Sequence, residues 1–201
     1  SPDGSHLATA CADGHAHLYR WNDPGAGPDP VLLPRVRAKK FSQVMAVAFH
    51  PDDSMLLTVS SEGSLRRWSR AGEELGEILL DGVRFGDVAI TRDGGTVAAL
   101  APRMLYLWPY ADLVRSAANS QKAIRLPRNT YCYSVAFSPD GRQVAVACTD
   151  SAVRLYDARS GEPVRTMTVH GGPVGEVAFS PDGKRIATAS ADRTFAVLPI
   201  A

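Results

Sequence analysis

The chain has 201 residues, of which 45% are hydrophobic and 21% are charged, with 17 Gly and 14 Pro, a composition typical of a globular, turn-rich protein. Its formal net charge of +1 gives no overall field that would attract nucleic acid or an acidic membrane surface. The longest apolar runs have about six residues, far fewer than the roughly 18 of a membrane-spanning helix. The short apolar runs argue against a membrane and the low net charge against nucleic acid, so neither is an expected partner.

A four-residue turn motif with an Asp at its third position returns five times along the chain. The copies are Ser1-Pro2-Asp3-Gly4, His50-Pro51-Asp52-Asp53, Thr91-Arg92-Asp93-Gly94, Ser138-Pro139-Asp140-Gly141 and Ser180-Pro181-Asp182-Gly183. The Asp residues are between 41 and 49 positions apart, close to the roughly 40 to 45 residues that one four-stranded blade of a propeller uses. The spacing therefore predicts a tandem repeat of one supersecondary unit.

The repeat unit has the pattern of four short strands, of which the first repeat lacks the first strand and the last repeat lacks the fourth. Apolar triplets before the last four turns predict first strands at 47–49, 88–90, 135–137 and 177–179. Runs after the turns, in which small and bulkier residues alternate, predict second strands at 7–11, 55–60, 96–100, 143–148 and 185–190. Large side chains close the third strands at Tyr19, Trp68, Trp108, Tyr156 and Leu198. Weaker fourth strands are expected at 31–33, 74–80, 123–126 and 164–169.

An apolar triplet, a Ser-Pro-Asp-Gly turn, a β run, an acidic turn and an aromatic residue follow one another, and this order resembles the WD-repeat (WD40) β-propeller family. The Phe-Ser-Pro-Asp-Gly form of the repeat is similar to that of bacterial members. The Trp-Asp dipeptide of the family is reproduced only loosely, and its Gly-His element survives as one His, His170. The resemblance implies an all-β, WD40-type propeller of about five four-stranded antiparallel blades.

The predicted strands divide the chain into a single propeller domain that is incomplete at both ends. The expected blades cover 1–33 (partial), 42–80, 84–126, 131–169 and 173–201 (partial), with three, four, four, four and three strands. We interpret the chain as part of a larger ring, of seven blades by family resemblance, and its remainder as a missing partner. A five-bladed ring that closes imperfectly is the alternative.

One set of polar residues resembles the structural tetrad of the family, in which a His, a Ser or Thr, an Asp and a Trp tie the strands of a blade together. The last repeat supplies His170, Thr188 or Ser190, and Asp192, whereas Leu198 replaces the aromatic member. Asp192 should then be nearly buried and bonded to His170. Such an arrangement serves the turn rather than catalysis, because buried polar groups need partners whether or not chemistry occurs.

Basic and aromatic residues coincide where the fourth strand of one blade leads to the first strand of the next. We expect this rim to bind a phosphorylated or acidic segment of a partner. The alternative is that these charges only keep the propeller soluble. The candidate residues are Arg37, Lys39, Lys40, Phe41, Arg84, Phe85, Arg128 and Tyr131, with Tyr133 beside them.

The three Cys residues are expected to be free thiols, because Cys11 and Cys148 occupy the same position of different repeats. Free thiols favour a reducing compartment, here the cytoplasm. No catalytic, cofactor-binding or metal site is expected, because no phosphate-binding loop, nucleophile elbow or metal motif is found and His15 and His17 have no third ligand near them.

The predicted function is that of a non-catalytic scaffold or sensor module of a larger signalling protein, which binds a protein or peptide through its loops. An alternative is a propeller enzyme with a pocket at the mouth of the central channel, where titratable groups would converge from several blades. A purely structural spacer is a third hypothesis.

Overall fold

The computed structural model describes residues 1–20, 30–32, 42–52, 54–115 and 120–200, which form five antiparallel sheets. In each sheet the strands follow the order of the chain. The first sheet contains β1 (His6–Ala10), β2 (Ala16–Arg20) and β3 (Pro30–Leu32). The second contains β4 (Val44–Phe49), β5 (Met55–Ser60), β6 (Ser64–Ser69) and β7 (Glu74–Leu79).

The other three sheets repeat this arrangement. The third contains β8 (Asp87–Ile90), β9 (Thr96–Ala101), β10 (Met104–Pro109) and β11 (Lys122–Arg125). The fourth contains β12 (Cys132–Phe137), β13 (Gln143–Cys148), β14 (Ala152–Asp157) and β15 (Pro163–Thr168). The fifth contains β16 (Val174–Phe179), β17 (Arg185–Ser190) and β18 (Phe195–Pro199).

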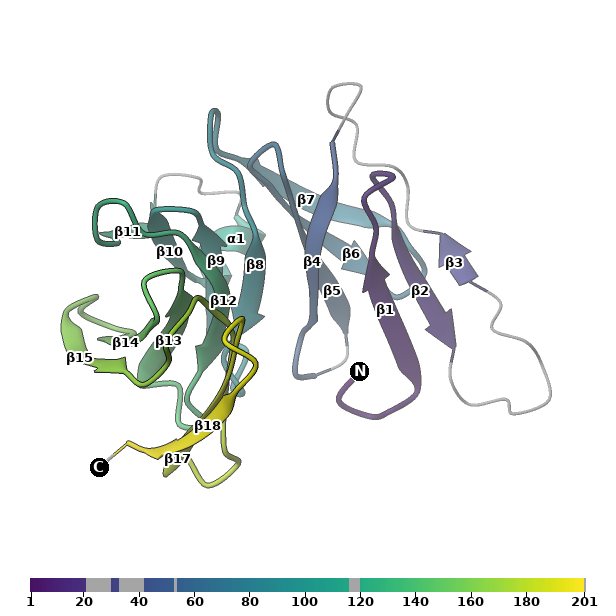
Figure 1. The fold of residues 1–201 in the computed structure, drawn as a ribbon. Coiled ribbons are helices and arrows are strands. Elements are labelled where there is room, and N and C mark those ends of the chain that lie inside the picture. Colours follow the sequence, from purple (N-terminus) through teal and green to yellow (C-terminus); the bar gives the residue numbers. More distant parts are fainter. Residues whose placement is uncertain (21–29, 33–41, 53, 116–119, 201) are drawn as a thin grey trace.

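The five sheets follow one another along an arc (Figure 1), with the β1–β3 sheet at one end and the β16–β18 sheet at the other. The first strands of successive sheets, β4, β8, β12 and β16, contact one another in that order. Within the described ranges, no helix is long and apolar enough to cross a membrane. The predicted all-β propeller class is confirmed, with an inner strand in each of the last four sheets.

The repeated Asp turns share one hydrogen-bonding pattern. Each Asp accepts a bond from the backbone N–H two residues later, at 2.9 to 3.1 Å, and pairs with the side chain two residues earlier. Gly4, Gly94, Gly141 and Gly183 complete the turns at φ near +70°, a conformation that favours glycine. These bonds hold the pKa of all five carboxyls below its usual range. The motif therefore shapes the hairpin between the first and second strands.

The hydrophobic core consists of layers between neighbouring sheets. On β9, Val97, Ala99 and Ala101 pack toward the second sheet, whereas Ala98 and Leu100 pack toward the fourth. Alternate side chains of a strand point to opposite faces, so a strand between two sheets is apolar on both. This explains the run of small apolar residues in the second strand of each central repeat.

A short helix follows β10. The sequence predicts one or two helical turns within 111–118 that dock Leu113 and Val114 on their own blade or, as the alternative, on a partner; residues 116–118 lie outside the described residues. The structure has α1 (Tyr110–Val114), which places Leu113 in the core shared with the second sheet. Val114 is 50% exposed, and its carbonyl accepts a bond from Arg67 Nη2 at 3.4 Å. Leu113 is therefore buried as expected, in a core that also includes the second sheet, whereas docking of Val114 on its own blade is not observed.

The cysteine prediction is corrected by the pairing of β12 with β13. Cys132 and Cys148 lie directly opposite each other in this register and form a disulfide, whereas Cys11 is free. The comparison of equivalent repeat positions missed the bond because the two partners belong to different strands of one blade. The premise for a reducing compartment is thereby removed.

The two Trp residues that close third strands differ in how their indole N–H groups are satisfied. Trp68 Nε1 donates to Thr58 Oγ1 at 2.9 Å, and both residues are buried. Ala99 occupies the position equivalent to Thr58 in the third sheet, since each lies two residues beyond the strand partner of its Trp. Trp108 Nε1 is buried and has no hydrogen-bond partner within the described residues.

We predict that Thr58→Val lowers the free energy of unfolding by about 1–3 kcal/mol, because it leaves the buried Trp68 N–H without an acceptor. Urea unfolding followed by Trp fluorescence measures the change. The control is Thr166→Val on the exposed part of β15, which should change stability by less than about 0.5 kcal/mol. Equal stability of wild type and Thr58→Val would show that the hydrogen bond from Trp68 to Thr58 does not stabilise the fold.

Thiol titration tests the disulfide. Under denaturing conditions without reductant, the chain should react with one equivalent of thiol reagent, at Cys11, and after reduction with three. Three reactive thiols before reduction would contradict the Cys132–Cys148 bond.

Candidate functional site

One side of the arc is formed by two kinds of loop held together by backbone hydrogen bonds. The connection into each of three inner strands bonds to the end of the second strand or to the turn after it, through Ser61 N to Gln43 O, Gly86 N to Leu100 O and Thr149 N to Tyr131 O. We call this side the rim, meaning residues 61–63, 80–86, 102–103, 126–131 and 149–151 with the first residues of the inner strands. The repeated Asp turns lie at the opposite ends of the strands.

The structure places the predicted rim residues unequally. Arg84, Arg128 and Tyr131 lie on the rim and are exposed. Phe85 is a correction, because it is 1% exposed and its ring packs edge-on against Tyr106 at a centroid distance of 5.8 Å. Successive side chains at the start of a strand point to opposite faces, and the Phe85 ring points into the core rather than toward a partner. The predicted residues Arg37, Lys39, Lys40 and Phe41 lie outside the described residues.

An aromatic hollow of about 370 Å³ opens on the rim between β4, β8 and β12. Its walls carry Met45, Arg84, Tyr131 and Tyr133, and the buried Phe85 forms part of the lining. Met45, Tyr131 and Tyr133 are 42%, 48% and 55% exposed, so this hollow presents large apolar surfaces to solvent. Surfaces of this kind mark sites of protein contact.

A second hollow, of about 470 Å³, lies beside it on the third sheet, and we call it the arginine hollow. Three exposed arginines line it together with the buried Leu126. Leu126 N donates to Arg103 O at 3.0 Å, which brings the turn before β10 alongside the end of β11. The lining residues are Arg103, Met104, Arg125, Leu126, Arg128 and Asn129.

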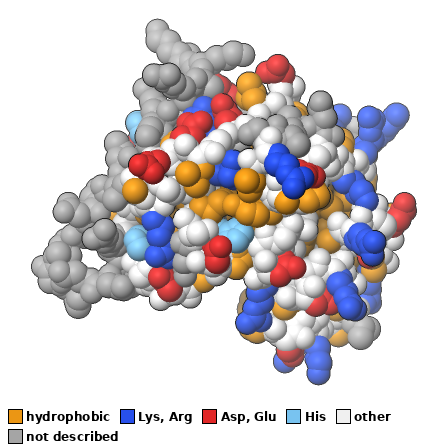
Figure 2. All heavy atoms as spheres, turned by 180° about the vertical axis from the view of Figure 1, so that it is seen from behind, with side chains coloured by type: hydrophobic (Ala, Val, Ile, Leu, Met, Phe, Trp, Pro, Cys, Tyr) orange, Lys and Arg blue, Asp and Glu red, His pale blue; other side chains and the backbone are white. Residues whose placement is uncertain are grey.

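The two hollows meet at one contact. The guanidinium carbon of Arg103, from the arginine hollow, lies 5.6 Å from the ring centroid of Tyr131, from the aromatic hollow. This cation–π geometry joins them into a continuous surface. In Figure 2, Lys and Arg side chains gather along the right-hand edge, over the half of the arc that contains β10, β11, β14 and β15 in Figure 1.

Arg103 and Arg125 were missed by the sequence analysis, although a signal for them exists. Between Asp93 and Asp140 the chain has five Lys and Arg residues but a single acidic one, Asp112. A net charge of +1 for the whole chain conceals this local excess. Charge counted per repeat therefore finds the arginine hollow, whereas charge counted over the chain does not.

The structure brings the tetrad residues of the last sheet together. His170 Nε2 lies 2.8 Å from Thr188 Oγ1, and His170 Nδ1 lies 3.3 Å from Asp192 Oδ2. Ser190 Oγ donates instead to the backbone carbonyls of Gly172 and Pro173. The Asp192 side chain is 18% exposed, more than expected, and hydrogen bonds, first from Thr194, hold its pKa well below its usual range. All these bonds fix the turn and the start of β16.

Two carboxylates, Asp87 and Glu176, lie on inner strands, where a propeller enzyme with a pocket at the mouth of its central channel would carry titratable groups. Asp87 on β8 accepts bonds from Val135 N and Val88 N, both at 2.8 Å. Ser134 on β12 donates to Glu176 on β16 at 3.2 Å and accepts from Val177 N at 3.4 Å. Burial raises the pKa of Asp87 to about 6, with a smaller contribution from the Glu176 charge. Both Asp87 oxygens thus already bind backbone N–H groups.

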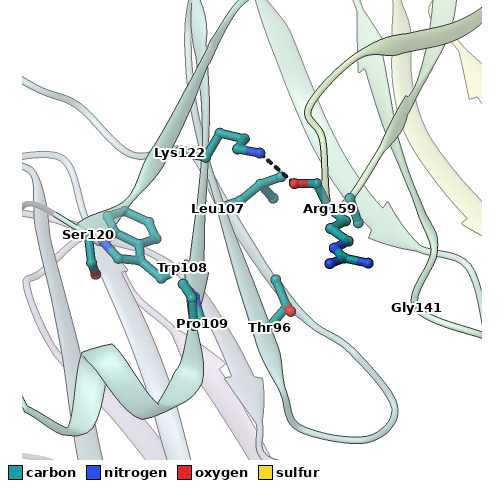
Figure 3. Close-up of a pocket in the computed structure, with 9 residues that line it drawn as sticks. Thr96, Leu107, Trp108, Pro109, Ser120, Lys122, Gly141 and Arg159 are labelled. Atoms are coloured by element: carbon teal, nitrogen blue, oxygen red, sulfur yellow. Dashed lines mark hydrogen bonds between the residues drawn. The ribbon is translucent and has the colours of Figure 1, made fainter.

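A third hollow, of about 350 Å³, lies between the third and fourth sheets (Figure 3). Lys122 Nζ donates to the carbonyl of Arg159 across it. Its titratable side chains are these two cations, a set that offers no acid–base pair. The remaining lining residues are Thr96, Leu107, Trp108, Pro109, Ser120, Gly141 and Ala158.

Comparison with known families agrees with the arrangement of five antiparallel sheets. Residues 1–20, 35–69 and 161–197 match the model of the WD domain, G-beta repeat. Residues 113–174 match the model of the anaphase-promoting complex subunit 4 WD40 domain. Both are β-propeller repeat models, and together they include all five sheets in part.

Three known proteins are similar to more than half of this chain. A WD repeat-containing protein 26 homolog of Arabidopsis thaliana is 23% identical over 159 residues, 78% of this chain. Coronin-7 of Homo sapiens is 28% identical over 167 residues, 76% of this chain. WD repeat-containing protein SL1-17 of Schistosoma mansoni is 30% identical over 119 residues, 59% of this chain. The chain spans 25%, 17% and 38% of the lengths of these relatives.

The raised pKa of Asp87 predicts a pH dependence. Between the unfolded value near 3.8 and the folded value of about 6, the native state holds a proton that the unfolded state has lost. The stability that wild type has relative to Asp87→Asn should therefore decrease as the pH rises from about 4 to about 7. Parallel urea titrations at several pH values measure this difference and cancel the contributions of other carboxyls. A difference that grows with pH would show that Asp87 is stabilised as a carboxylate instead.

Proposed function

Because the chain belongs to the WD40 repeat family, we propose that it is a non-catalytic interaction module that binds a segment of a partner protein along its rim. WD40 domains are in general protein-interaction modules, and the rim is where this chain offers both apolar surface and charge. The partner is a protein or peptide, and the interaction needs no cofactor.

The observation that carries the proposal is the junction of the two hollows at Arg103 and Tyr131. On one side of it Met45 and Tyr133 supply exposed apolar surface, and on the other Arg125 and Arg128 supply charge. Aromatic residues and arginines are enriched where protein interfaces concentrate their binding energy. A segment with an apolar side chain next to an acidic group would complement both hollows.

The geometry of the inner strands supports a binding role over catalysis. Each oxygen of Asp87 accepts a backbone hydrogen bond, from Val88 N and from Val135 N, which gives this carboxylate a structural role between two strands. The bonds of Asp192 likewise go to its own turn, through Gly171 N and Thr194 N. These bonds support a structural role for both carboxylates.

We further propose that the module belongs to a larger scaffold or signalling protein. Its coverage of a small part of each relative supports this, since such modules are typically joined to other domains in one chain. Rim loops on a stack of rigid sheets are suited to present a fixed surface to a partner.

Affinity capture with matched variants tests the proposal. We expect Tyr131→Ala/Tyr133→Ala to reduce capture of the specific partners of the wild-type chain by about tenfold or more, because exposed aromatic anchors are lost. Quantitative mass spectrometry of the eluates measures the loss. The control is Arg142→Ala/Lys184→Ala, on the Asp turns at the opposite ends of the strands, which should leave capture unchanged. If the Tyr variant still captures the partners and the Arg142→Ala/Lys184→Ala variant does not, the partners bind at the Asp turns and not at the rim.

A further inference from the structure

We propose that the arginine hollow is a phosphate-binding site that takes a phosphorylated side chain of the partner segment. This inference rests on the proposed function and specifies which chemical group the rim recognises. Its ligand class is a phosphate monoester on an extended peptide.

The three arginines of the hollow carry positive charge that no described residue of the protein pairs. Within the described part of the chain, Arg103, Arg125 and Arg128 form no ion pair, whereas Arg66 is paired with Glu77 and Arg154 with Asp150. Three guanidinium groups around one hollow repel one another until an anion enters. A phosphate monoester carries a charge of about −1.5 to −2 at neutral pH and three acceptor oxygens, and therefore neutralises more of this charge than a single carboxylate.

Ordered backbone carries the three arginines. Arg125 pairs with Met104 in the β10–β11 register, directly beside Arg103. Arg128 precedes Asn129, whose φ of 61° produces a sharp turn. The buried Thr130 then fixes the end of this turn, because its Oγ1 donates to Asp150 Oδ2 at 3.2 Å. A site whose backbone is ordered before binding loses less entropy when the ligand enters.

The lining of the arginine hollow also includes apolar side chains. Leu126 is 2% exposed and, with the partly buried Met104, gives the hollow an apolar component between the charged walls. The carbon stem of a phosphorylated side chain can pack there while the phosphate oxygens meet the guanidinium forks, whose planar donors suit bidentate phosphate contacts.

The neighbouring aromatic hollow favours a peptide over other phosphate carriers. Exposed Met45, Tyr131 and Tyr133 begin where Arg103 stacks on Tyr131, so the phosphate lies next to an apolar subsite. A nucleic acid would need positive charge along an extended track, whereas the three arginines gather around one hollow and the aromatic hollow beside it has Arg84 as the one cation among the described residues of its lining. The complementary ligand is a segment with one phosphorylated residue and a neighbouring apolar side chain.

The first test uses inorganic phosphate and the 201-residue chain. Side-chain Nε–Hε NMR signals of Arg103, Arg125 and Arg128 should shift as phosphate is added, and should not shift with sodium chloride of equal ionic strength. Arg142, an exposed arginine at the opposite ends of the strands, is the internal control. Equal responses of Arg142 and the three arginines, or none at all, would overturn the site.

The second test uses peptide libraries with a fixed phosphoserine or phosphothreonine and random flanks, compared with the same libraries after dephosphorylation. Dephosphorylation should weaken binding by about tenfold or more, and Arg103→Met/Arg125→Met/Arg128→Met should abolish that difference. Arg142→Met should not change it. Circular dichroism checks that the triple variant folds, and separate Arg→Met variants replace it if it does not.

The outcomes separate this inference from the proposed function. If phosphorylated and unphosphorylated libraries bind alike while Tyr131→Ala/Tyr133→Ala weakens both, the phosphate site is wrong and the rim remains a binding surface. If neither library binds, the peptide assignment is overturned. Tighter binding of a single-stranded RNA or of phosphoinositide vesicles, lost in the same arginine variants, would likewise overturn the peptide as the ligand.

Discussion

Hydrogen bonds from the backbone of one inner strand to a side chain of the preceding one tie the third sheet to the fourth and the fourth to the fifth. Inner strands are edge strands, so one row of their N–H groups has no partner within its own sheet. Asp87 Oδ2 accepts from Val135 N at 2.8 Å, and Ser134 Oγ accepts from Val177 N at 3.4 Å. The same position of consecutive repeats thus provides an acceptor for the following repeat.

The second sheet shows what happens where the acceptor is missing. Ala46 occupies the position of Asp87 and Ser134, since each directly precedes the Val-Ala pair of its inner strand and is paired in the equivalent register. Ala46 has no acceptor for Val88 N, which bonds instead to Asp87 Oδ1. Asp87 therefore satisfies two backbone donors on two strands, and this double role explains why a partly buried carboxylate is retained there despite its raised pKa.

These ties connect the fold with the proposed function. Tyr131 and Tyr133 lie within three residues of Ser134, so the bond network at the inner strands also sets the position of the aromatic hollow. The polar elements typical of a WD40 blade are divided between repeats: His170, Thr188 and Asp192 occur in the fifth sheet, and the Trp68–Thr58 pair in the second. Degenerate repeats can thus keep the architecture while their rim residues differ.

The fold class followed from the sequence because the Asp turns act locally. Asp140, for example, binds its own Ser138 and Arg142 N, and such short-range chemistry can be seen in a linear pattern. The candidate site depends on contacts between strands, which a linear pattern does not specify. Phe85 turns into the core, and Arg103 meets Tyr131 from a different sheet.

Other predictions failed for the same reason. The Cys132–Cys148 disulfide depends on a cross-strand register that repeat alignment does not reveal. The pairing of Arg103 with the end of β11 likewise depends on the strand register of the third sheet. Local turns and alternation could therefore be predicted from the sequence, whereas the grouping of side chains on the rim could not.

Amide hydrogen exchange at Val135 tests the inter-sheet bond most directly. The account predicts that this amide exchanges slowly in wild type, although it lies on an edge strand, and that Asp87→Ala accelerates it while Val177, bonded to Ser134, keeps its protection. Rapid exchange of Val135 in wild type, or an unchanged rate in Asp87→Ala, would show that the inner strands are held together by something else.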